Sequence, residues 1–474
     1  MKRLKLKKDA GAITGIETGL DAVTELSDEV LRSNILKLAI PATLEQILIM
    51  VVGVVSTIFM GRIGKEALSA VGLINILTNF ILALFTALST GSTVLVARLI
   101  GEKNLKGARE AVKQSLAIAI VSSIFVTILC YIFAGRIINL LFSQADRRVI
   151  SLALIYFRIT LYSFPLLLIN TIVSGVLRGA GDTKTPMKVA YIVNIINVIL
   201  SLILIFGVHT NILTIRPLGL VGAGIAVSIA RAIGGIAILI SLLRNKIIPA
   251  EFIKGFSFNL PIIKRMLRVG IPAALEQFIM QGGFLLLQVI ISGMGTAAIA
   301  VYQIGMSINS ISFMPVWGFS MAATTLVGQS LGGLKPHLAE EYVRRILKMS
   351  LILICILGSM SFSFSRQLVS IYSSDPEIIR IGNFAIKILS LSLPFLCLVS
   401  VISSSLRGAG DIIYVTITTF IGIWGFRLTL AILLDRLFNL NIYGVWIAVC
   451  TDFAIRGLLY LARFRRGRWK NAVV

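Results

Sequence analysis

The sequence predicts an all-α, polytopic membrane protein with 12 transmembrane helices in two pseudo-symmetric six-helix bundles. The first indication is composition: 57% of the 474 residues are hydrophobic, 14% are charged, and mean hydropathy is +0.94. A soluble domain carries about a quarter charged residues. The second indication is a series of apolar runs of roughly 18 or more residues, long enough to cross a hydrocarbon core of about 30 Å as helices. The third is an internal duplication.

Three motifs occur twice, in the same order and at nearly the same spacing. I-P-A-T-L-E-Q at 40–46 returns as I-P-A-A-L-E-Q at 271–277, a shift of 231 at both the proline and the glutamate (272 − 41 and 276 − 45). The other two are L-V-A-R-L-I-G at 95–101 with L-V-G-Q-S-L-G at 326–332, and L-R-G-A-G-D at 177–182 with its copy at 406–411, shifted by 229 (406 − 177). The second half of the chain is therefore interpreted as a duplicate of the first.

The elements follow in chain order. Residues 1–33 are polar and lack the short apolar core of a signal peptide, so we expect a cytoplasmic tail. The first bundle, 34–243, has predicted spans at approximately 35–60, 68–97, 114–135, 149–177, 188–208 and 221–243. A basic linker is expected at 244–265. The second bundle, 266–464, has predicted spans at approximately 266–292, 296–327, 346–365, 379–406, 412–435 and 444–464, and 465–474 form a basic cytoplasmic tail.

The distribution of basic residues predicts the orientation. Because each repeat has six spans, an even number, both repeats enter the membrane from the same side, and a parallel repeat is expected. With cytoplasmic termini, the cytoplasmic segments hold roughly thirty Lys and Arg and the external loops roughly nine, as the positive-inside rule requires. The net charge of +24 is thereby explained without nucleic acid. We expect a monomer in the plasma (inner) membrane, whose partners are the lipid bilayer and a small-molecule substrate.

Matched prolines and glutamates stand inside the spans. Pro41 and Pro272 are expected in the first turns of spans 1 and 7, where the lost amide bond kinks a helix, and Pro165 and Pro394 are expected to share a kink in spans 4 and 10 (394 − 165 is 229). An ionisable group at the bilayer centre costs about 2.5–3.5 kcal/mol on insertion scales, so it needs a partner or a watery cavity. The glutamates and the glutamines that follow them, Glu45, Gln46, Glu276 and Gln277, are expected to face each other between the bundles. They either line a substrate pathway or cap the kinked backbone.

A second set of charges lies in the last two spans. Arg427 and Asp452 are predicted at the same depth, where pairing is the cheapest way to keep either in hydrocarbon. An internal ion pair and a proton-coupling role both remain open, and Arg456, one turn from Asp452, can compete for it. Uncharged polar residues in the spans, among them Gln281, Tyr302 and Gln303, either contact substrate or bond neighbouring helices.

Several function classes are disfavoured by missing motifs. The chain has no G-x-x-x-x-G-K-[ST] phosphate loop, so ATP hydrolysis is not expected, and no H-E-x-x-H or G-x-S-x-G motif of a hydrolase. Its four cysteines lie singly in apolar runs and its two histidines lie far apart, so neither a metal site nor a cofactor is expected. An enzyme using Asp452 and Glu276 as acid and base is a remote alternative.

The motifs together resemble the multidrug and toxic compound extrusion (MATE) transporters. The resemblance is carried by V-S-T-I-F-M-G-R-I-G at 55–64, L-R-G-A-G-D-T-K-T-P at 177–186, W-G-F-R at 424–427, G-V-W-I-A at 444–448 and R-F-R-R-G-R-W at 463–469, and covers roughly residues 34–470. It implies two lobes in a V shape and cation-driven export of amphipathic organic cations or other small molecules through a central cleft. Asn197 matches a family asparagine, whereas Ser56, Ser201, Met280 and Leu396 stand at or near positions where members carry acidic residues.

These observations lead to one hypothesis and one main alternative. The hypothesis is a secondary active antiporter that exports small amphipathic cations by alternating access, driven by H⁺ or Na⁺, with Glu45 and Glu276 as the coupling carboxyl groups. The alternative is a flippase for a large, anionic, lipid-linked precursor, which requires a cleft lined with Arg and Lys.

Overall fold

The computed structural model describes residues 27–142, 146–209, 214–244 and 257–472. Within these ranges, eleven helices are long and apolar enough to cross a membrane, and a bent pair of shorter helices brings the total to 12. The predicted fold class is therefore confirmed. Most of the predicted amino-terminal tail (1–26), the middle of the linker (245–256) and the last two residues lie outside the described residues.

The first repeat begins earlier than expected, because its first helix starts at Asp28, so that 28–33 are helical and do not belong to the tail. Its helices are α2 (Asp28–Ile63), α3 (Lys65–Gly101), α4 (Leu105–Leu141), α5 (Arg147–Leu161), α6 (Phe164–Gly179), α7 (Lys184–Phe206) and α8 (Gly219–Arg244). Between α7 and α8, the two-residue strands β1 (Val208–His209) and β2 (Thr214–Ile215) form an antiparallel pair.

The second repeat is helical from Leu260, so the end of the predicted linker already belongs to its first helix. Its elements are α9 (Leu260–Ser292), α10 (Thr296–Gly332), α11 (Pro336–Ser363), α12 (Ser365–Ser370), α13 (Pro376–Ala409), α14 (Ile412–Phe420), the π-helical turn η3 (Ile421–Leu428), α15 (Thr429–Phe438), α16 (Asn441–Arg465) and the short 3₁₀ helix η4 (Arg468–Asn471). Since α14, η3 and α15 are continuous, they form one span.

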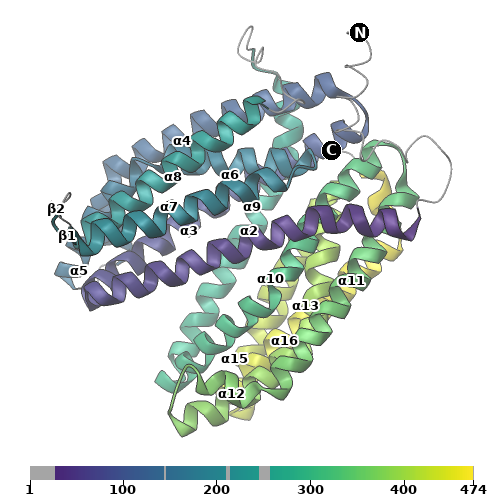
Figure 1. The fold of residues 1–474 in the computed structure, drawn as a ribbon. Helices are drawn as coiled ribbons and strands as arrows, with labels where there is room; N and C mark the ends of the chain where they lie inside the picture. The colour runs from purple at the N-terminus through teal and green to yellow at the C-terminus, as the bar shows by residue number, and fades with distance from the viewer. Residues whose placement is uncertain (1–26, 143–145, 210–213, 245–256, 473–474) are drawn as a thin grey trace.

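The two bundles form a V (Figure 1). They converge at the end where α2 begins and diverge towards the end that carries α5 and α12. The carboxyl-terminal segment lies at the converging end, because Arg98 Nη1, near the end of α3, donates to the carbonyl oxygen of Ala472 at 2.8 Å. The carboxyl-terminal segment therefore adds to the contact between the bundles at this end.

The first helix of each repeat crosses between the bundles. Helix α2 contributes Leu31 and Ile35 to the buried core of the second bundle but Met60 to that of the first. Helix α9 does the reverse, with Met266 in the first core and Ile291 in the second. Pro41 and Pro272 lie well inside these helices and not in their first turns as expected, because both helices begin about a dozen residues earlier.

A reciprocal glycine contact holds the converging ends together. A Cβ atom on Gly101 would lie 2.0 Å from the carbonyl oxygen of Gln329, and one on Gly332 would lie 2.0 Å from that of Arg98. The internal repeat relates these two contacts to each other, because Gln329 is the equivalent of Arg98 and Gly332 is the equivalent of Gly101 (329 − 98 and 332 − 101 both equal 231). The backbones of α3 and α10 can approach this closely only where side chains are missing. The motif pair at 95–101 and 326–332 is therefore the interface itself.

A second matched contact stiffens each bundle between its second and fourth spans. Thr93 Oγ1 donates to the Gly175 carbonyl at 2.8 Å, and Thr324 Oγ1 donates to the Ser404 carbonyl at 3.0 Å. The repeat relates these residues (324 − 93 is 231, 404 − 175 is 229). Matched sequence positions thus occupy matched places in space.

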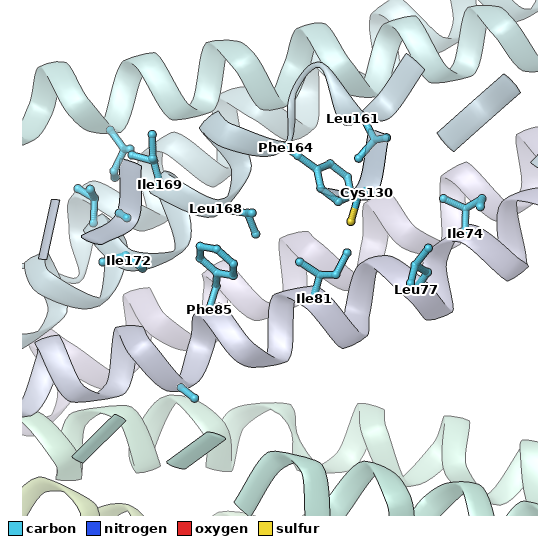
Figure 2. Packing of buried hydrophobic residues seen from close by; sticks show 14 of the residues in the cluster. Ile74, Leu77, Ile81, Phe85, Cys130, Leu161, Phe164, Leu168, Ile169 and Ile172 are labelled. Atoms are coloured by element: carbon cyan, nitrogen blue, oxygen red, sulfur yellow. The ribbon is translucent and has the colours of Figure 1, made fainter. Parts of the chain in front are cut away.

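The fourth spans depart from this symmetry. In the first bundle the span is broken into α5 and α6, bent by 59°. Figure 2 shows Leu161 and Phe164 on either side of the break, packed above Ile81 and Phe85 of α3. Pro165 starts α6 and cannot donate a backbone hydrogen bond, whereas Pro394 lies inside the continuous helix α13. The matched prolines therefore differ in their local structure: one lies at a break in its span and the other inside a continuous helix.

The glycine contact leads to a stability prediction. Gly101→Ala should lower the free energy of unfolding by about 1–3 kcal/mol, because the added methyl group overlaps the Gln329 carbonyl. Gly72→Ala is the matched control in the same helix, since nothing lies within 4 Å of its Cβ position. It should gain about 0.5–1 kcal/mol from helix propensity. Thermal unfolding of the purified variants in detergent measures both, and equal behaviour of the two would contradict the prediction.

Candidate functional site

A cavity of about 390 Å³ lies between the bundles. Most of its wall comes from the second bundle, from α9, α10, α13, α14, η3 and α16, and the first bundle adds α3 and Arg178 at the end of α6. A volume of this size is typical of sites for drug-sized ligands. The cavity is therefore asymmetric although the fold is pseudo-symmetric.

Much of the wall is apolar and aromatic. Phe284, Phe313, Trp317 and Phe453 line it, together with hydroxyl groups of α3, α10 and α13. Tyr302 also lines it and stacks on Trp446, with ring centroids 5.4 Å apart. Such a surface accommodates the apolar part of a ligand, and a few polar groups fix the orientation of the ligand.

Two matched ion pairs lie near the cavity. In the first repeat, Arg178 Nη1 donates to both carboxylate oxygens of Glu45, at 3.1 and 3.2 Å. In the second, Arg407 Nη1 donates to those of Glu276, at 2.9 and 3.3 Å. Each joins the first span of a repeat to the fourth span of the same repeat. Each glutamate is therefore paired with an arginine of its own repeat.

A third charged cluster is buried in the second bundle. Arg427 Nε donates to Asp452 Oδ2 at 3.0 Å, and Arg456 Nε donates to Asp452 Oδ1 at 2.7 Å. Gly422 makes room for it, because a Cβ there would lie 2.4 Å from both Arg456 and Asp452. Arg427 belongs to the π-helical turn η3, a local geometry that is frequent at functional sites. Two guanidinium groups thus share one carboxylate.

Comparison with known proteins identifies this architecture. The model of the MatE family matches residues 41–203 and 272–433, one match in each repeat and together more than half of the chain. The chain belongs to the MATE family of transporters. A probable multidrug resistance protein NorM from Thermotoga maritima is 34% identical over 452 residues, which cover 94% of each chain. A probable multidrug resistance protein from Bacillus subtilis, YoeA, is 24% identical over 91% of this chain and 93% of its own.

Solved structures show the same fold. A crystal structure of a MATE protein in a bent conformation superimposes with a TM-score of 0.84 at 22% identity, over 92% of this chain and 95% of the other. A MOP superfamily transporter from Pyrococcus furiosus, described as having a binding pocket of reverse polarity, gives the same TM-score and identity over 93% and 97%. At this identity the likeness concerns the fold alone.

The structure brings together only part of the residue set expected from the sequence. Glu276, Gln277, Tyr302, Arg427 and Arg456 line the cavity, and Asp452 lies directly behind its wall. The remaining candidates are not among the lining residues: Glu45, Gln46, Ser56, Asn197, Ser201, Gln281 and Gln303. Ser201 donates to Asn197 Oδ1 at 3.0 Å, so these two bond each other within α7. Met280 and Leu396, near positions where other members carry acids, do line the cavity as apolar residues.

Sequence reasoning missed Arg178 and Arg407. Both lie in the L-R-G-A-G-D motif, which served only as a landmark of the repeat. Their equivalence (407 − 178 is 229), at the ends of membrane helices and alongside two equally matched glutamates, was the available signal. The sequence also gave no reason to single out Asn309, whose Oδ1 is buried at the cavity wall without a hydrogen-bond partner among the described residues.

The first ion pair leads to a testable coupling energy. Arg178→Gln leaves the Glu45 carboxylate buried and unpaired, which should cost about 3–5 kcal/mol of stability. The double variant Glu45→Gln/Arg178→Gln should cost less than the sum of the single changes, because no unpaired charge remains. Arg344→Gln removes the exposed pair with Glu340 and should cost less than about 1 kcal/mol. Additive effects at Glu45 and Arg178 in thermal unfolding would show that the pair is energetically unimportant.

Proposed function

We propose that this MATE transporter is a secondary active exporter of small amphipathic organic molecules, driven by inward movement of H⁺ or Na⁺. The observation that carries the proposal is a drug-sized, aromatic-walled cavity between bundles whose α3 and α10 backbones meet at the converging end. Rocking of the bundles about such a contact exposes the cavity to one side at a time. The multidrug resistance named for the relatives from T. maritima and B. subtilis supports extending export to this chain.

The orientation is part of the proposal. We place both termini in the cytoplasm and the protein in the plasma (inner) membrane, because basic residues are concentrated in the segments at that side. The converging end then faces the cytoplasm, and the V is open outward (Figure 1). We expect a monomer that needs no cofactor besides its coupling ion.

Glu276 is the best-placed coupling group. It lies in the cavity wall, bonded to Arg407, and Thr419 Oγ1 also donates to it at 3.5 Å. A proton or Na⁺ arriving at this carboxylate would compete with Arg407 for it. Arg407 itself belongs to α13, which packs on α10 through the bond of Thr324 Oγ1 to the Ser404 carbonyl, so release of Arg407 would act next to that contact. Glu45 and Asp452 are not among the lining residues, although the side chain of Glu45 is about as exposed as that of Glu276.

The flippase alternative is supported by one observation and opposed by another. Four arginines line the cavity, as an anionic substrate requires. However, a volume of about 390 Å³ suits a drug-sized molecule and not a large lipid-linked headgroup. The amphipathic cation expected from the family resemblance would find one carboxylate at the wall, Glu276, already paired.

A vesicle assay tests the proposal. Proteoliposomes are loaded with fluorescent amphipathic dyes of positive, negative and zero charge, and a pH or Na⁺ gradient is imposed separately. At least one dye should move faster with one of the gradients than without it. Glu276→Gln should reduce that rate to the value without a gradient, because an amide cannot exchange a proton or hold Na⁺ as a carboxylate does.

The control is Glu377→Gln, an exposed glutamate at the start of α13, which should transport like the wild type. Gradient-independent movement of every dye in the wild type would refute cation coupling. Movement of a lipid-linked sugar without movement of any dye would favour the flippase.

A further inference from the structure

The charges around the cavity do not cancel. Among the described residues, four arginines line the cavity and pair with three carboxylates, of which one lies at the wall and two lie behind it. One positive charge (4 − 3) is left without a counter-charge. The seven residues are Arg178, Arg407, Arg427, Arg456, Glu45, Glu276 and Asp452. Two of the groups are balanced one-to-one pairs. The excess therefore belongs to the third group, in which Arg427 and Arg456 share Asp452.

This excess charge is deeply buried. The side chains of Arg427 and Arg456 are 3% and 6% exposed, and that of Asp452 is 0% exposed. A buried charge without a counter-charge is unfavourable in a protein and more so within a membrane. The hydrogen bonds to Asp452 use Nε and Nη2 of each arginine, so Nη1 of each is left for a ligand in the cavity that both residues line.

The surroundings of the two guanidinium groups suit an amphipathic partner. The Arg427 guanidinium carbon lies 5.5 Å from the ring centroid of Phe284 and 5.1 Å from that of Phe453, and Arg456 lies 5.6 Å from the Phe453 ring. Both rings line the cavity. An anionic group bound at Nη1 would therefore have its apolar body against aromatic rings. Arginine presents a planar fork of donors that matches carboxylate, sulfonate and phosphate oxygens.

We propose that the cavity takes amphipathic organic monoanions, with the anionic group bound by Arg427 and Arg456 and the apolar body against Phe284 and Phe453. The proposal rests on the proposed export function and names its substrate class. A monocation in the same position would meet two guanidinium groups and only one carboxylate. The buried Arg427–Asp452–Arg456 cluster is thus an anion subsite as well as a structural ion pair.

Two probes with the same ring system and permanent opposite charges test the substrate class. These are naphthalene-2-sulfonate and trimethyl(2-naphthyl)ammonium, measured by equilibrium binding to the purified protein and by efflux from proteoliposomes. The wild type should bind the sulfonate at least about tenfold more tightly than the ammonium, because a hydrogen bond to a charged group contributes that much. The sulfonate should also be exported.

Variants locate the site and separate charge from folding. Arg427→Gln leaves a balanced Arg456–Asp452 pair and should weaken sulfonate binding at least about tenfold. The double variant Arg427→Gln/Asp452→Asn again has one excess positive charge and should recover much of the lost sulfonate affinity. If the cluster were only a structural ion pair, the second change would not restore binding. Arg465→Gln, an exposed change near the end of the same helix as Arg456, should bind like the wild type.

The outcomes distinguish the two proposals. Unchanged sulfonate binding by Arg427→Gln, or a double variant weaker than the single one, would refute the anion subsite. Export of the ammonium probe without the sulfonate would refute the substrate class and leave the export function intact. Failure to move either probe, together with every dye of the panel above, would refute the export function itself.

Discussion

The reciprocal contact of Gly101 with Gln329 and of Gly332 with Arg98 is the constraint on which the rest of the structure depends. Backbone against backbone, it brings α3 and α10 together at one end and leaves the bundles free to diverge at the other. Few polar bonds reinforce it: Thr325 Oγ1 donates to the Arg178 carbonyl at 3.0 Å, and Gln329 Nε2 to the Gly179 carbonyl at 3.1 Å. In a membrane such bonds contribute only about 0.6–2 kcal/mol each. Under the proposed rocking motion, this is the contact that would have to open and close.

The crossing helices α2 and α9 connect this contact to the cavity. Helix α2 begins in the core of the second bundle, yet Glu45 in its middle is bonded to Arg178 of the first. Helix α9 is related in the same way, through Glu276 and Arg407. When the bundles separate, each crossing helix must bend between its two anchors. Pro41 and Pro272 lie at that place, four residues before each glutamate, where a backbone hydrogen bond is already missing. Under the proposed rocking motion, the matched proline would act as a hinge and the glutamate as its anchor.

The sequence alone was sufficient to predict the features that depend on the internal repeat or on hydrophobicity. The duplication, the number of spans and the pairing of Arg427 with Asp452 by depth follow from spacing alone. The partners of Glu45 and Glu276 could not be predicted from the sequence, because the depth of a residue in the membrane does not indicate which neighbouring helix its side chain contacts. Pro165 and Pro394 show a similar limit: identical positions gave a 59° break in one bundle and a continuous helix in the other. Tertiary packing decides whether a proline breaks a span. It also determines that most of the cavity wall comes from the second bundle.

The sign of the substrate charge determines how transport can be driven. A proton on Glu276 would raise the net charge of the cavity groups from +1 (4 − 3) to +2 (4 − 2). For a cationic substrate the proton is a competitor, and competition at one site is what antiport requires. For an anion the same proton would strengthen the electrostatic attraction, so coupling would then depend on the release of Arg407 from Glu276 and not on competition at one site. An outward-moving monoanion instead gains about 2.3 kcal/mol per 100 mV from an inside-negative potential. For the proposed monoanion, this contribution would add to that of the cation gradient.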